Sequence, residues 1–212
     1  MAFNTEKNLY TVFFAALMVV VVGSILAYLA SGLKPLIKDN ERFEKQQNIL
    51  YAMGVNDNEG TGSVSFIPTD RVEDVFTSYI KEQLVISGDQ ITQDDQAYLI
   101  DMKKQLAARK KGQPYKLPVY IGEKDDKKFH ILPMDGKGLW DAIWGFIALD
   151  EDMIVQGVYF DHKAETPGLG ANIKERFFMD DFEGESIMED GRLVGIKVIK
   201  GNNDPANTDK DD

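Results

Sequence analysis

Residues 136–170 read GKGLWDAIWGFIALDEDMIVQGVYFDHKAETPGLG, and the rest of the chain is organised around this stretch. It opens on a glycine-rich bend at Gly136 and Gly138, continues through two apolar runs, and closes on a turn at Pro167 and Gly168. Glycine and proline favour tight bends, and consecutive backbone N–H groups in such bends can point at one ligand. The stretch therefore predicts a slot for a small, flat, anionic ligand between the two bends.

The turn Glu165–Gly170 (ETPGLG) is the sharpest local signal, because Thr166 adds a hydroxyl and Glu165 a carboxylate to the turn backbone. Two plainer interpretations stand beside the binding site. The turn can be an ordinary surface turn. Trp140 and Trp144 can be core residues instead of stacking platforms. The two histidines, His130 and His162, are each expected to have a structural or surface role.

Composition excludes several classes of function. The chain has 212 residues and a formal net charge of −11, which disfavours binding to DNA or RNA. It has no cysteine, which excludes disulfides, thiolate metal sites, protein-ligated iron–sulfur clusters and a cysteine nucleophile. With two histidines, a histidine-rich metal site is excluded as well. No dinucleotide fingerprint is present, so NADH is not expected to bind here.

A membrane anchor is predicted at residues 9–30, which carry no charged side chain. As a helix this segment is roughly 33 Å long, enough to span a bilayer core. A buried core helix or a cleaved signal peptide fits the uniform apolar run less well. The positive charges lean towards a cytoplasmic C-terminal side, although long domains can cross the membrane regardless of charge. These charges are Lys7 before the span and Lys34, Lys38, Arg42 and Lys45 after it.

The remaining chain reads as helices first and strands later, which predicts an α+β fold with a mostly antiparallel sheet. A helix over 40–54 begins at the cap Asn40, a capping box of Asp70 and Glu73 precedes a second, and Thr92 caps a third over 92–111. The strands are expected at 64–67, 116–121, 128–132, 139–149, 153–160 and 193–199. The domain boundaries follow: 1–8 flank, 9–30 transmembrane helix, 31–54 juxtamembrane helix, 55–200 α+β domain and 201–212 polar tail.

Taken together, several stretches resemble the C subunit of the sodium-translocating NADH:quinone oxidoreductases, an FMN-binding family. The resemblance covers most of the chain, and its motifs occur in the family's order. ETPGLG is shared with the flavoprotein subunit of Rnf-type electron-transport complexes, whereas GLW favours the sodium pump. The matching stretches are the apolar span, QQNILYAMGV (46–55), LPVYIG (117–122), GKGLWDAIWGFIALDED (136–152), ETPGLG (165–170) and LVGIKVIKG (193–201).

The resemblance implies an electron-carrying subunit that is anchored in the bacterial inner membrane with its domain on the periplasmic side. Its partners would be the other membrane subunits of the same complex and the lipid bilayer. The family carries FMN on a threonine of a Ser-Gly-Ala-Thr-type motif, which residues 1–212 lack, so we assign no flavin-bearing threonine and expect an incomplete C-terminus.

The residues expected to line the flavin are Glu165, Thr166, Gly168, Leu169 and Gly170, with Leu139 and Trp140 behind them. No catalytic acid or base is expected, because an electron relay uses the chemistry of its cofactor. Two alternatives stay open: the Rnf-type flavoprotein subunit, and a membrane-tethered scaffold domain without a cofactor.

Overall fold

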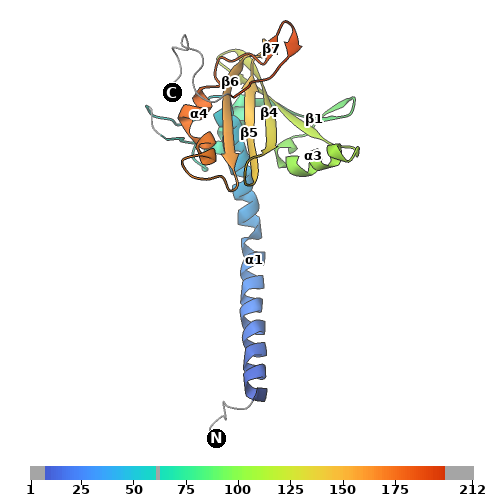
Figure 1. Cartoon of the computed structure of the whole chain (residues 1–212), viewed down its shortest axis with the longest axis vertical. Helices are drawn as coiled ribbons and strands as arrows, with labels where there is room; N and C mark the ends of the chain where they lie inside the picture. The colour runs from blue at the N-terminus through green and yellow to red at the C-terminus, as the bar shows by residue number, and fades with distance from the viewer. Residues whose placement is uncertain (1–7, 61–62, 199–212) are drawn as a thin grey trace. The chain divides into compact units, whose positions relative to one another are not determined.

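A 45-residue helix, α1 (Asn8–Ala52), begins the computed structural model, which describes residues 8–60 and 63–198 (Figure 1). Within these residues it is the one helix long and apolar enough to cross a membrane. The predicted cap at Asn40 is wrong, because Asn40 lies inside α1. The segment after the apolar run is rich in Lys, Leu, Arg, Glu and Gln, and these good helix formers let the helix continue.

The chain divides into two compact units, Met1–Glu41 and Arg42–Asp212. The second unit contains a six-stranded antiparallel sheet with the order β2-β1-β3-β4-β5-β6. This sheet confirms the predicted α+β class. Its strands are β1 (Ile80–Ser87), β2 (Gln90–Gln93), β3 (Leu117–Lys124), β4 (Lys127–Lys137), β5 (Ala142–Leu149) and β6 (Val155–His162).

Short helices and a small hairpin complete the second unit. In Figure 1 α4 lies beside β6 at the left of the sheet, and α3 lies near β1 at its right. These elements are α2 (Val72–Tyr79), η1 (Ala97–Leu99), α3 (Met102–Lys110), η2 (Gly170–Lys174), α4 (Arg176–Asp180), β7 (Met188–Glu189) and β8 (Arg192–Leu193).

The predicted helix over 92–111 is wrong in its first half. Thr92 belongs to β2 and pairs with Val85 of β1. Pairing with β2 supplies hydrogen-bond partners to the backbone N–H and C=O groups of β1. A helix over residues 92–111 would leave these groups without those partners. A helix forms only later, as α3, where the side chain of Asp101 accepts a hydrogen bond from the N–H of Lys104 at 3.1 Å.

Three further sequence predictions fail. Residues 64–67 form no strand. Asp70 caps no helix, since α2 follows Arg71 and has no side-chain cap. In the segment 193–199 a strand covers only Leu193 at the end of β8, and residue 199 lies outside the described residues. Single backbone hydrogen bonds take the place of a ladder in the two strand-like segments: the N–H of Asp57 donates to the carbonyl of Ser65, and those of Val194 and Gly195 donate to the carbonyl of Ile187.

The core of the second unit lies between the sheet and the C-terminal end of α1. Ile49, Leu50 and Ala52 of this helix end are fully buried. At Gly157 of β6, an added Cβ would lie 2.6 Å from the carbonyl oxygen of Ala52. Glycine at this position therefore lets the helix backbone approach the sheet directly, which fixes where the helix crosses it.

Candidate functional site

The two glycine-bearing bends meet at one edge of the sheet. The first bend connects β4 to β5, and the second follows the end of β6. Since β5 and β6 are antiparallel neighbours, with Ile143 opposite His162, the start of β5 lies beside the end of β6. The topology thus brings residues 138–141 and 163–170 together, which is the meeting of bends that the sequence predicts.

Glu165 joins the two bends. Its Oε1 accepts hydrogen bonds from the backbone N–H of Trp140 at 3.0 Å and of Asp141 at 3.4 Å. Glu165 is buried, with 8% of its surface exposed. Gly138 and Gly170 pack against this carboxylate: a Cβ at Gly138 would collide with Oε1, and one at Gly170 would lie 2.7 Å from Oε2. The glycines therefore leave the space that the carboxylate fills.

A second hydrogen bond fixes the indole of Trp140. Its Nε1–H donates to the hydroxyl oxygen of Thr166 at 3.0 Å. Trp140 is 66% exposed, so its interpretation as a core residue is wrong. Leu139 and Leu169 are exposed to 82% and 72%. The two joined bends thus carry three exposed apolar side chains, those of Leu139, Trp140 and Leu169, which we call the ledge.

The turn backbone leaves donors available beside this ledge. Gly168 has a φ of +74°, which glycine adopts without strain, and nothing lies near its missing side chain. The N–H groups of Leu169 and Ala171 both donate to the carbonyl of Thr166, at 3.1 and 3.2 Å. Those of Gly168 and Gly170 have no acceptor within residues 8–60 and 63–198. The ledge thus combines exposed apolar surface with backbone donors.

His162 makes a hydrogen bond to the backbone of the turn. Its Nδ1 accepts a hydrogen bond from the N–H of Glu165 at 3.2 Å. Its Nε2 is buried and finds no partner among the described residues. The hydrogen bond from Glu165 joins residues three positions apart in the chain, so it is local to the turn and gives His162 a structural role.

The cation of the turn is already paired. The ammonium group of Lys163 lies 2.9 Å from Oδ2 of Asp141. The hydrogen bond from Lys163, together with one from the N–H of Ala142, holds the pKa of Asp141 below its ordinary value. Lys163 is therefore already engaged by a carboxylate of the bend before β5. The exposed apolar side chains of the ledge can contact a flat ring, and the N–H groups of Gly168 and Gly170 can donate to acceptors at the edge of that ring.

Known proteins match the part of the chain that contains these two bends. The family model of the FMN-binding domain matches residues 138–211, which include the second bend and the first bend from Gly138 onward. A Neisseria meningitidis protein, named as the C subunit of the Na(+)-translocating NADH-quinone reductase, is 30% identical over 86% of this chain and 72% of its own length. A Vibrio anguillarum protein of the same name is 28% identical over 95% and 81%. The crystal structure of the C subunit from Parabacteroides distasonis aligns with a TM-score of 0.67 and 30% identity, over 79% and 77% of the two chains.

Proposed function

Because the chain belongs to the C-subunit family of the Na(+)-translocating NADH-quinone reductases, we infer that it is the FMN-carrying electron-transfer subunit of such a complex. Its partners are the other subunits of that complex. NADH is oxidised elsewhere, since this chain has no dinucleotide-binding fingerprint. The chain relays electrons within an assembly that transfers them from NADH to quinone and exports sodium.

We place the FMN ring on the ledge of Leu139, Trp140 and Leu169. Bound FMN supplies the redox chemistry, and the chain supplies position and surroundings. The exposed apolar side chains would cover one face of the ring, and the N–H groups of Gly168 and Gly170 would donate to acceptors on its edge. The observation that carries this proposal is the double link of Trp140, through its N–H to Glu165 and through its indole to Thr166.

We propose further that FMN is held covalently. The support is electrostatic: a flavin phosphate is doubly charged, and the lysine of the turn is engaged by Asp141. A covalent link removes the need for a cationic pocket. Residues 1–212 contain no motif of the attachment type, so no residue is assigned to the link.

Retention of the flavin through denaturation tests the covalent link. The protein is isolated with its complex from the natural source and separated on a denaturing gel. Its band is expected to show yellow flavin fluorescence under ultraviolet light. Flavin that leaves the protein on acid precipitation contradicts the covalent link, whereas a protein without any flavin contradicts the FMN proposal and favours a scaffold domain.

We propose that residues 9–30 cross the bacterial inner membrane and that the sheet domain lies on the periplasmic side. The charges after the span favour the opposite orientation, but a long domain can be translocated regardless of charge. The chain has no cysteine, so Asp89→Cys in the exposed turn between β1 and β2 creates a single label site. Intact cells are expected to react with a membrane-impermeant maleimide. Labelling only after lysis contradicts the periplasmic placement.

A further inference from the structure

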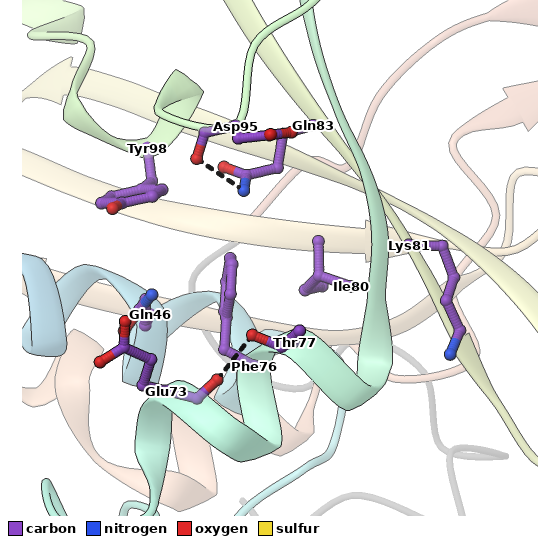
Figure 2. A pocket seen from close by; sticks show the side chains of 9 residues that line it. All are labelled: Gln46, Glu73, Phe76, Thr77, Ile80, Lys81, Gln83, Asp95 and Tyr98. Carbon is purple, nitrogen blue, oxygen red and sulfur yellow. Dashed lines mark hydrogen bonds between the residues drawn. The ribbon is translucent and has the colours of Figure 1, made fainter.

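A cavity of about 440 Å³ lies away from the ledge. It is lined by residues of α1, α2, β1, η1 and the segment that leads into η1, and Figure 2 shows these side chains. In the sheet order β1 is next to one edge strand, whereas β5 and β6, which carry the ledge, lie at the other end. Its volume is in the range of small-molecule sites.

Two amide side chains of this cavity have unused acceptors. Gln46 of α1 is 4% exposed, and its Oε1 has no hydrogen-bond donor among the described residues. The Oε1 of Gln83 is also buried without a donor there. The Nε2 of Gln83 donates to the carbonyl of Asp95 at 2.9 Å, which settles which end of this amide is the acceptor (Figure 2). Buried acceptors without donors are unusual, so both call for an explanation.

The charged residues that line the cavity are Glu73, Lys81 and Asp95. The carboxylate of Asp95 has no ion pair among the described residues. Glu73 has one partner, the guanidinium of Arg42 at 3.4 Å, and its carboxylate is largely exposed. The ammonium group of Lys81 donates to the carbonyl of Ser78 at 2.6 Å, and Figure 2 shows it turned away from the other lining residues. Asp95 is thus the lining carboxylate with which a bound cation could pair.

The cavity also has an apolar wall. Phe76 and Ile80 are 3% and 7% exposed. The ring of Tyr98 meets that of Phe76 edge to face, with 6.1 Å between the centroids. Aromatic faces attract cations and flat organic groups. A hydrated metal ion would leave this wall unused, whereas a cation with a flat organic body would cover it.

We propose that this cavity binds an organic cation that donates hydrogen bonds from a flat group, of the amidinium or guanidinium type. Such a group combines several N–H donors with one positive charge and a planar face. It would give Gln46 and Gln83 the donors that they lack, pair with Asp95, and lie against the ring of Tyr98. The same chemistry occurs on small molecules and on an arginine side chain of a neighbouring protein in the complex.

Calorimetric titration of the full chain in detergent with benzamidinium, and with its neutral isostere benzamide, tests the charge requirement. Benzamidinium is expected to bind at least about tenfold more tightly, because a hydrogen-bonded charge pair adds to the shared ring contact. Equal affinities would show that the positive charge contributes nothing, and no binding of either probe would show that the cavity takes no such ligand; either result would overturn the proposal.

Matched variants locate the site. Asp95→Asn removes the charge but keeps the backbone carbonyl that accepts from Gln83, and it is expected to weaken benzamidinium binding about tenfold. Asp89→Asn removes the same charge from the exposed β1–β2 turn and is expected to leave binding within about twofold. An equal loss in both variants would mean attraction by net charge only, against the proposal. Circular dichroism verifies that both variants fold.

A titration of the assembled complex distinguishes the two sources of the cation. If benzamidinium still binds there, the cavity is open to a small molecule. If binding is lost in the complex but present in the isolated chain, a cationic side chain of a neighbouring protein fills the cavity. Both outcomes support the proposed chemistry, which the isolated chain has already tested.

Discussion

The carboxylate of Glu165 accepts a hydrogen bond from the backbone N–H of Trp140 at 3.0 Å, across a separation of 25 residues. This contact joins the bend before β5 to the turn after β6. Glu165 is buried and its own N–H donates to His162, so its position is determined from both sides. A ligand on the ledge therefore meets a surface that is already formed.

Glu165→Ala is expected to lower the free energy of unfolding by about 2 kcal/mol, because two backbone N–H groups lose a charged acceptor. Urea denaturation followed by circular dichroism measures the change. Glu165→Gln is the control, since its amide oxygen can take the place of Oε1 and should preserve most of the stability. An alanine variant as stable as the wild type would contradict the joining role of Glu165.

Thr166→Val is expected to free the indole of Trp140 while the domain stays folded. The hydroxyl that accepts from Nε1 is lost, and an exposed hydrogen bond of this kind contributes at most about 1 kcal/mol. Tryptophan fluorescence anisotropy should fall, and the redox potential of bound flavin should shift. Thr166→Ser keeps the acceptor and serves as the control. If the valine variant matched the serine variant in both measurements, the indole would not depend on Thr166.

Gly145→Ala is expected to destabilise the sheet by about 3 kcal/mol, at the upper end of the usual cost of overpacking. The added Cβ would collide with the backbone carbonyl of Tyr159 on β6, which cannot move without disturbing the β5–β6 pairing. Thermal unfolding measures the loss. Gly136→Ala is the matched control, because its Cβ would lie 3.4 Å from the flexible side chain of Ile143. Equal melting temperatures for the two variants would contradict the collision.

Asp101 is expected to make the stability of α3 depend on pH. The hydrogen bond from the side chain of Lys104 holds the pKa of Asp101 below its ordinary value of 3.8. Since the folded state favours the ionised carboxyl, the stabilisation is present above pH 3.8 and is lost as the pH falls through the lower pKa of the folded state. Asp101 is largely exposed, so the effect is small and local.

Hydrogen exchange of the α3 amides across this acidic range measures the effect. Asp101→Asn is the informative comparison, because asparagine still caps a helix but does not titrate. Its α3 amides should show a flatter pH dependence than those of the wild type. The same dependence in both proteins would assign the acid sensitivity to another group.

Local patterns in the sequence predicted much of the fold. The uncharged N-terminal run predicted a long apolar helix, and strand-like runs after Pro114 predicted four of the six strands of the main sheet. The helix predicted at Thr92 failed because its acidic start and basic end are equally compatible with a strand, a turn and a shorter helix. Pairing with β1 decided between them, and this pairing is a tertiary contact.

Some features of the candidate site could likewise be predicted from the sequence, and others depend on the tertiary structure. The glycines, the proline and the exposed apolar residues of both bends could be found in the sequence, because each acts through its own backbone or surface. That Glu165 reaches Trp140 depends on antiparallel neighbours aligned at Ile143 and His162, whereas the hydrogen bond between His162 and Glu165 joins residues three apart in the chain. The assignment of FMN to both bends remains a proposal.

The sequence by itself determined the apolar helix, the antiparallel character of the sheet and the chemistry available in its turns, because these depend on residues close together in the chain. Only the tertiary structure decided that Trp140 is an exposed platform and not a core residue. It also decided that Gln46 and Gln83 line one cavity. The physical reason is that burial and hydrogen-bond partners come from strands and helices that are distant in the chain, and a local pattern does not encode which of them become neighbours.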